Sequence, residues 1–174
     1  PVSSLGIDKK SGNIRTKKMG YFYADKDNFE DVQRSAGTFG MRHPLTFLLE
    51  AADDIAYKTA DIEDAVKKGC ISYERLLQEL RGFRPEQQTE QYRRIVSWLE
   101  ERFGKGVQRD YSRPDLYAVQ NWVISAQGQM IAGVTDCFTA NYGAIMDGSY
   151  GKDMFAGTGV ELLMDALGDI AFRY

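Results

Sequence analysis

One run of the chain, residues 44–68, constrains its fold more than any other. Its apolar and small side chains recur three and four positions apart, at Leu45, Leu48, Leu49, Ala52, Ile55, Ala56, Thr59, Ile62 and Val66. An α-helix turns by about 100° per residue, so this spacing gathers the side chains on one face. Pro44 suits the first turn of a helix, and Gly69 suits its C-terminal cap. The run therefore predicts a long helix with one buried face.

The rest of the sequence favours further helices and no strands. Helical patterns occur at residues 25–35, 73–81, 86–103, 115–146 and 158–171. Ser72 is expected to cap the second of these, and Phe29 and Val32 are expected to point inward from the first. Residues 115–146 predict one helix or two, because Gly128 and Gly133 interrupt the pattern. The predicted fold class is all-α, a helical bundle.

Glycines and charged residues divide the chain and narrow its partners. Residues 1–43 are predicted to be a loop-rich segment with one short helix, and residues 44–174 a helical domain; residues 104–112 are predicted to be a loop. The 174 residues carry a net charge of −3, which argues against a generic nucleic-acid binder. Two distant cysteines fit a reducing cytosol. The chain begins at Pro1 without a methionine, so we expect it to start inside a longer protein.

The predicted helix at 44–68 has an acidic side. Asp53, Tyr57 and Asp61 are spaced four apart, so they form one row along the helix. A tyrosine among carboxylates offers a flat ring and a hydroxyl to a sugar or a base. The alternative is an ordinary solvated face, which is the default for surface charge.

Three neighbours of this row carry their own expectations. The pair Ala51–Ala52 allows a partner helix to approach closely. Glu63 is near the apolar stripe, where an unpaired carboxylate is costly, so we expect an arginine partner. Asp54 and Lys58 are expected to form an exposed ion pair.

These residues resemble a known family. The runs RHPLTFLLEAADDIAY at 42–57 and DIEDAV at 61–66 are similar to bacterial deoxyguanosine triphosphate triphosphohydrolases (dGTPases), which belong to the HD-domain superfamily. The segments KKMGYF at 17–22 and NYGAIMDG at 141–148 agree with the same family. The resemblance covers most of residues 15–150 and implies an all-α bundle that forms the C-terminal part of such an enzyme.

The resemblance also implies a role for four residues. Asp53 corresponds to the last ligand of a divalent metal, Mg²⁺ or Mn²⁺. Tyr57 corresponds to a residue that packs on the deoxyribose and excludes a 2′-hydroxyl, and Asp61 to one that accepts a hydrogen bond from the 3′-hydroxyl. Lys18 corresponds to a contact to the triphosphate. The reaction implied is hydrolysis of dGTP, or of dNTPs generally, to the deoxynucleoside and inorganic triphosphate.

One departure from the family is large. The sequence has no His-Asp pair, and His43 precedes a proline at the entry of the predicted helix. The other metal ligands and the catalytic residues of the family are therefore missing, so we expect no catalytic residue here and no activity from this chain alone. The implied partners are an upstream HD segment, further copies in a homo-oligomer such as a hexamer, and a single-stranded DNA effector, in the cytoplasm. The alternative is a non-catalytic regulatory or assembly module that kept the scaffold and lost the metal centre.

Overall fold

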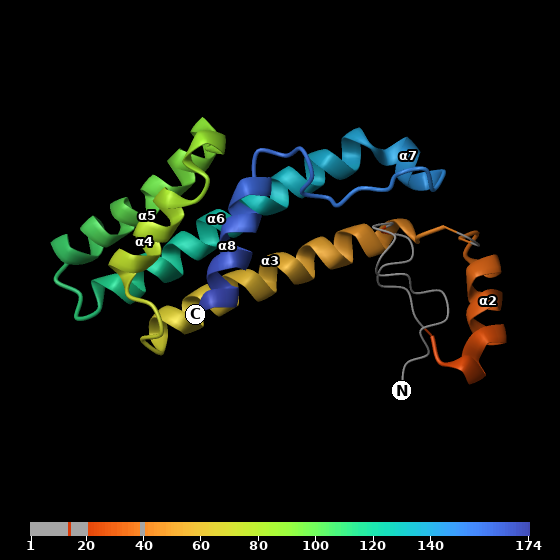
Figure 1. Cartoon of the computed structure of the whole chain (residues 1–174), viewed down its shortest axis with the longest axis horizontal. Coiled ribbons are helices and arrows are strands. Elements are labelled where there is room, and N and C mark those ends of the chain that lie inside the picture. The colour runs from red at the N-terminus through yellow and green to blue at the C-terminus, as the bar shows by residue number, and fades with distance from the viewer. Residues whose placement is uncertain (1–13, 15–20, 39–40) are drawn as a thin grey trace. The chain divides into compact units, whose positions relative to one another are not determined.

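Helices make up most of the computed structural model, which describes residue 14 and residues 21–38 and 41–174 (Figure 1). No strand occurs among these residues, so the all-α prediction is confirmed. In chain order the elements are η1 (Tyr23–Asp25), α2 (Lys26–Ser35), α3 (Pro44–Lys67), α4 (Tyr73–Gly82), η2 (Pro85–Gln87), α5 (Glu90–Gln108), α6 (Pro114–Ala140), α7 (Tyr142–Met146) and α8 (Glu161–Arg173).

The chain forms two units, each with its own internal contacts. Unit 1 comprises Pro1–Leu49 and Phe138–Met154, and unit 2 comprises Glu50–Cys137 and Phe155–Tyr174. The boundaries between the units fall after Leu49 in α3, after Cys137 in α6 and after Met154. The predicted domain boundary at residue 43 stays a prediction.

Unit 1 is organised by aromatic contacts. Tyr21 stacks on Phe29 of α2 with 4.6 Å between ring centroids. Phe47, in the second turn of α3, meets the edge of Tyr150 at 5.6 Å and carries the Arg42 guanidinium over its ring at 4.9 Å. These contacts hold the N-terminal turns of α3 against the segment after α7.

Unit 2 is built around the buried face of α6. Seven residues of that helix are buried: Ala118, Val119, Trp122, Val123, Ala126, Met130 and Val134. The Trp122 indole N–H donates to the carbonyl of Ile95 in α5 over 2.8 Å. The Tyr92 hydroxyl donates to the Leu80 carbonyl over 2.7 Å, and burial raises the pKa of that phenol. These two buried side chains thus have hydrogen-bond partners where the helices cross.

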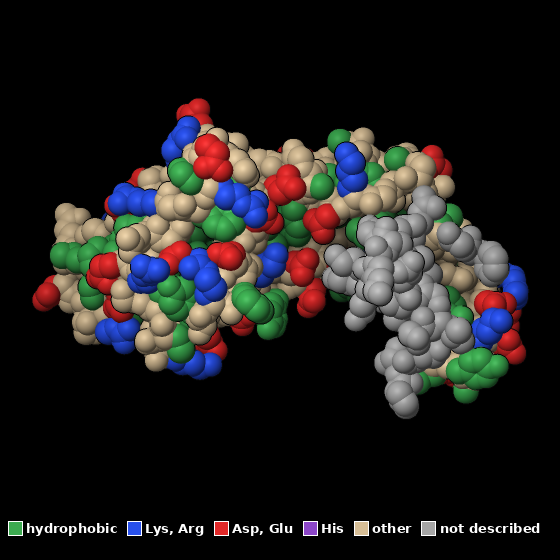
Figure 2. Space-filling model, in the orientation of Figure 1, with side chains coloured by type: hydrophobic (Ala, Val, Ile, Leu, Met, Phe, Trp, Pro, Cys, Tyr) green, Lys and Arg blue, Asp and Glu red, His purple; other side chains and the backbone are tan. Residues whose placement is uncertain are grey.

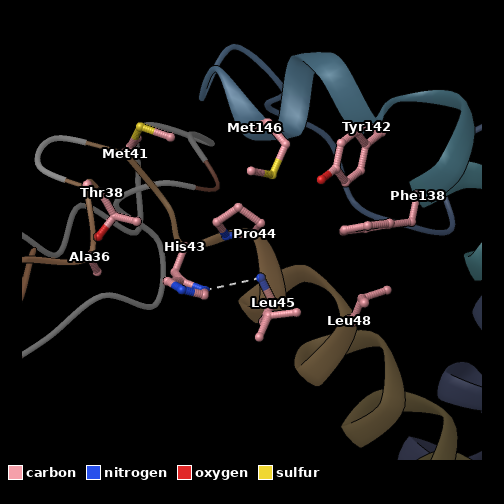
Figure 3. A pocket seen from close by; sticks show the side chains of 11 residues that line it. Ala36, Thr38, Met41, His43, Pro44, Leu45, Leu48, Phe138, Tyr142 and Met146 are labelled. Carbon is pink, nitrogen blue, oxygen red and sulfur yellow. Dashed lines mark hydrogen bonds between the residues drawn. The ribbon is translucent and has the colours of Figure 1, made fainter.

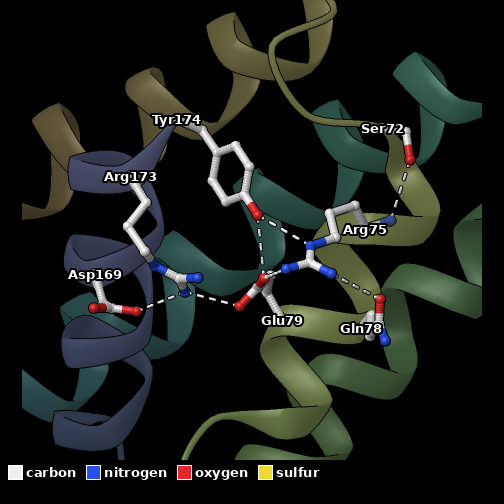
Figure 4. A network of polar contacts seen from close by, with 7 residues as sticks. All are labelled: Ser72, Arg75, Gln78, Glu79, Asp169, Arg173 and Tyr174. Carbon is white, nitrogen blue, oxygen red and sulfur yellow. Dashed lines mark hydrogen bonds and ion pairs between the residues drawn. The ribbon is translucent and has the colours of Figure 1, made fainter.

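A network of polar contacts joins α4 to the end of α8 (Figure 4). Glu79 lies at its centre, with a side chain only 14% exposed. It accepts from Arg173 at 2.8 Å and from the Tyr174 hydroxyl at 3.1 Å, and it pairs with Arg75 at 2.6 Å. Hydrogen bonding from Arg173, and then from Tyr174, holds the pKa of Glu79 below its usual 4.5 against the opposing effect of its burial. The network fastens the last helix to the bundle.

Most predicted helices are found where the sequence placed them. The helix predicted at 44–68 is α3, and Ser72 caps α4 by accepting from the Arg75 amide over 3.2 Å. The stretch 115–146 is two helices, which separate at Asn141 rather than at a glycine. Gly128 and Gly133 stay helical because the buried face of α6 outweighs their low helix propensity.

Two expectations about local structure were wrong. The helix predicted at 86–103 starts later and runs on through Gln108, so the predicted loop at 104–112 is mostly helix. Packing explains the extension: Gly106 is buried, and a Cβ there would lie 3.1 Å from Pro114 and Tyr117, so glycine permits the close approach of α6. Val32, predicted to point inward, is 66% exposed.

The surface carries acidic and basic side chains in similar numbers, as the near-balanced charge of the sequence predicts. Acidic and basic side chains are interspersed on the face shown in Figure 2, without a field of one sign. Within the ranges that the structure describes, no helix is both long and apolar enough to cross a bilayer.

The Glu79 network leads to a prediction on stability and pH. Glu79→Gln keeps the shape but removes the charge, so it should lower the free energy of unfolding by about 1 kcal/mol at pH 7. Because the folded pKa is lowered, this contribution is complete above pH 4.5 and is lost as the pH falls through the folded pKa. Urea unfolding of both proteins at several pH values measures the gap. Glu101→Gln, on the exposed side of α5, is the control, and a gap that does not change with pH contradicts the assignment.

Candidate functional site

Helix α3 has a buried face and an exposed face. The burial of one face determines in which direction the other side chains of the helix point. Ala51, Ile55, Thr59, Ile62 and Val66 are buried. Their spacing is that of a single helical face, so residues half a turn away must point outward. The predicted face was partly wrong: Leu45, Leu49, Ala52 and Ala56 were expected to be buried and are exposed, because α6 and α8 contact α3 along the narrower stripe of Ile55, Thr59 and Ile62. The face that is buried decides which side chains of α3 are free to meet a ligand.

The predicted row is on the outward side. Asp53 is exposed, Tyr57 is 67% exposed, and Asp61 is partly exposed. Among the residues that the structure describes, none of the three makes a hydrogen bond or an ion pair within the chain. An aromatic ring this exposed contributes little to the stability of its own unit. The structure thus brings these three side chains together along one helix and gives them no structural partner.

Two expected ion pairs on α3 were wrong. Glu63 accepts from the side-chain amide of Gln120 in α6 over 2.9 Å, so its partner is a glutamine rather than an arginine. The Lys58 ammonium donates to the Met164 carbonyl of α8 over 3.4 Å rather than pairing with Asp54. Both side chains reach across to a neighbouring helix, because α6 and α8 flank the buried face of α3.

Sequence reasoning missed a pair of glutamines that joins α6 to α3. Besides Gln120, the Gln127 amide donates to the Thr59 hydroxyl over 2.8 Å, and that hydroxyl donates on to the Ile55 carbonyl over 2.7 Å. The signal was present: two glutamines seven residues apart lie on the same side of a mostly apolar helix. These bonds fix the position of α3 beside α6 within unit 2.

The exposed carboxylate of Asp53 fits one ligand of a divalent metal and no more. A carboxylate oxygen is the hard donor that Mg²⁺ and Mn²⁺ prefer. Over the described ranges, however, no three His, Cys, Asp or Glu side chains gather as a metal site. A complete coordination sphere therefore needs donors from outside these residues.

His43 and Lys18, the other residues singled out, have different outcomes. The Nδ1 atom of His43 accepts from the Leu45 amide over 3.2 Å, and its carbonyl accepts from the Thr46 amide over 2.9 Å. Both bonds satisfy amides of the first turn of α3, which is the helix-entry role expected from the sequence. Lys18 lies outside the described residues.

Unit 1 holds a cavity of about 370 Å³ beside His43 (Figure 3). Its walls are mainly apolar and aromatic, with Leu48 of α3, Phe138 at the end of α6, and Tyr142 and Met146 of α7. Phe138 and Tyr142 meet edge to face at 6.0 Å. The described lining residues include no carboxylate and no amine, and their titratable side chains are those of His43 and Tyr142, so the cavity mainly suits an apolar group.

Comparison with known proteins gives relatives of one kind. No family model matches the chain. It is 37% identical, over its entire length, to a protein of Listeria monocytogenes named deoxyguanosinetriphosphate triphosphohydrolase-like protein, of which it spans 36%. It is 29% identical to the deoxyguanosinetriphosphate triphosphohydrolase of Yersinia enterocolitica, over 87% of the chain and 30% of that relative. A Synechocystis protein of the first name is 42% identical over 65 residues, which are 33% of the chain and 15% of that relative.

The chain thus spans about a third of the length of the Listeria and Yersinia relatives. The similarity covers all elements of both units, including the α3 row. The chain belongs to the family of deoxyguanosinetriphosphate triphosphohydrolase-like proteins, as the counterpart of a segment about a third of their length.

Proposed function

We propose that this chain is the nucleotide-facing part of a metal-dependent dNTP triphosphohydrolase. The observation that carries the proposal is the row of Asp53, Tyr57 and Asp61, which is at least partly exposed and has no hydrogen-bond or ion-pair partner among the described residues. The names of the relatives support hydrolysis of deoxyguanosine triphosphate as the reaction. Water attacks the substrate, and the products are deoxyguanosine and inorganic triphosphate.

Two residues of the row are suited to the sugar. The Tyr57 ring packs against the deoxyribose, where an extra 2′-hydroxyl has no room. The Asp61 carboxylate, one turn further along, accepts a hydrogen bond from the 3′-hydroxyl. Both groups are accessible in this chain, so neither has to break an internal contact to bind.

Asp53 supplies one ligand for the metal, Mg²⁺ or Mn²⁺. When bound, such an ion supplies Lewis acidity at the α-phosphate and makes a bound water more acidic. The other ligands come from an upstream HD segment of the parent protein, by which we mean the longer polypeptide that contains this chain. Lys18 provides a compact positive charge for the triphosphate.

The proposal extends to the state of the parent protein. It forms a homo-oligomer, with a hexamer as one form, and single-stranded DNA is a candidate effector. Cys70 and Cys137 form no disulfide, in keeping with a cytoplasmic protein. The competing function is a non-catalytic assembly module on the same scaffold, which binds no metal through Asp53.

The first prediction separates this chain from its parent. The purified 174-residue chain, given Mn²⁺ and dGTP, should release no triphosphate, because its described residues contain no cluster of three acids, histidines or cysteines that could hold the metal. The parent should release triphosphate under the same conditions. Turnover by the chain alone contradicts the proposed division of the site, and a parent that never turns over favours the assembly module.

The second prediction concerns Asp53 in the parent. Asp53→Asn should lower turnover by about 100-fold or more and weaken Mn²⁺ binding, because a neutral amide is a poor ligand for a hard cation. The melting temperature without metal should not change, since the carboxylate has no hydrogen-bond or ion-pair partner among the described residues. Asp64→Asn is the matched control, because Asp64 pairs with Lys68 at 3.0 Å on the same helix. Equal effects of the two variants contradict the role of Asp53.

The third prediction concerns the sugar. Tyr57→Ala should let the parent accept GTP, narrowing its preference for dGTP over GTP by about 10-fold or more, because the ring no longer excludes the 2′-hydroxyl. Competition assays with dGTP and GTP measure the preference. An unchanged ratio with lower overall activity assigns Tyr57 to general binding instead.

A further inference from the structure

The most exposed apolar residues of unit 2 include two isoleucines on one side of α6. Ile124 is 68% exposed and Ile131 is 56% exposed. Each follows by one helical turn a glutamine whose amide binds α3, namely Gln120 and Gln127. The two isoleucines therefore lie on the side of α6 that borders α3, above the line of contact.

A row of alanines lies on the matching side of α3. Ala52 and Ala56 precede Glu63 by 11 and seven residues, which puts each within about 20° of that contact residue around the helix. Both alanines and the next in the row, Ala60, are exposed. In the antiparallel register set by the two glutamine contacts, Ile131 and Ile124 come level with Ala56 and Ala60 to within about one turn. We call this surface the α3–α6 face: Ala52, Ala56, Ala60, Ile124, Gly128 and Ile131.

Gly128 is unexplained unless something covers this face. It is in the middle of a 27-residue helix, where glycine is a poor helix former. A Cβ at Gly128 would meet nothing within 4 Å. Gly133 on the same helix is different, because a Cβ there would lie 2.8 Å from Val160. Gly133 is needed for a contact inside the chain, whereas no such contact accounts for Gly128.

We propose that an α-helix from the remaining part of the parent protein packs on the α3–α6 face. Residues four apart form a ridge on a helix, and a row of alanines makes that ridge low enough for another helix to approach closely. A helix in that position contacts Gly128 and covers both isoleucines.

The identity of the occupant follows from two facts. The chain spans only 36% of its Listeria relative, so the relative has ample further polypeptide to cover the face. The alanines also alternate with Asp53 and Tyr57 along α3, so a segment seated there brings its own side chains next to that row. The inference rests on the proposed function in one respect: the seated segment is the one that completes the metal site.

Three glycine-to-alanine variants test the proposal, because it predicts whether each one raises or lowers the melting temperature. Thermal melts are recorded for the 174-residue chain and for the parent. In the chain, Gly128→Ala should raise the melting temperature by roughly 2–4 °C, because the helix gains propensity and the space is open. In the parent the same variant should lower it, because the added methyl group meets the seated helix.

Two matched controls bracket that result. Gly104, in α5, also has open space around its Cβ position, so Gly104→Ala should raise the melting temperature of both proteins. Gly133→Ala should lower it in both, because of Val160. If Gly128→Ala raises the melting temperature of the parent as well, the proposal is wrong.

Cysteine labelling provides a second readout that does not depend on stability. Ile124→Cys should react with a maleimide in the chain at a rate comparable to that of the exposed native Cys70. In the parent its rate should fall by about 10-fold or more relative to Cys70, as burial protects it. Peptide mapping separates these positions from Cys137. Equal rates in chain and parent overturn the proposal, as does concentration-dependent protection in the chain alone, which assigns the face to a second copy.

The outcomes keep this inference apart from the proposed function. If the parent hydrolyses dGTP while position 124 stays reactive, the proposed function holds and the proposed docking face is wrong. If position 124 is protected in the parent but the parent shows no turnover, the proposed docking face holds and the proposed function is wrong.

Discussion

The burial of one face of α3 is the constraint on which the rest of the structure depends. Once Ile55, Ile62 and Val66 point into unit 2, helix geometry alone sends Asp53 and Tyr57 outward. The same geometry turns the alanine row toward the free edge beside α6. The exposure of the candidate site and that of the proposed docking face thus both follow from the burial of the opposite face of α3.

Polar contacts make that packing specific. An apolar stripe tolerates rotation or sliding of one helix against another, whereas hydrogen bonds require particular partners. Gln127 bonds to Thr59 and Gln120 bonds to Glu63, one turn apart along α3 and two turns apart along α6. A shift of α6 by one turn would leave the buried Thr59 hydroxyl without its glutamine. These two bonds therefore set the register that brings Ile131 level with Ala56.

The features that could be predicted from the sequence are those that depend on residues close together in the chain. The start of α3 at Pro44 and the Ser72 cap follow from residues close in the chain, and both were found in place. The partner of Glu63 could not be predicted in this way, because Gln120 is distant in sequence and only the fold brings it near. The same holds for the continuation of α5 through Gly106, which depends on Pro114 approaching it. The roles of Asp53 and Tyr57 came from family resemblance, since spacing alone equally fits a solvated face.

The most direct test of the central idea, that α3 presents a metal ligand, is where Mn²⁺ binds in the parent protein. A bound paramagnetic ion broadens the NMR signals of nearby methyl groups, and isotope-labelled alanine methyls provide probes along α3. If Asp53 is a ligand, Mn²⁺ will selectively broaden the methyl signals of Ala52 and Ala56 and leave that of Ala166, buried in α8, sharp. If the Ala52 and Ala56 signals stay as sharp as that of Ala166, Asp53 does not hold the metal.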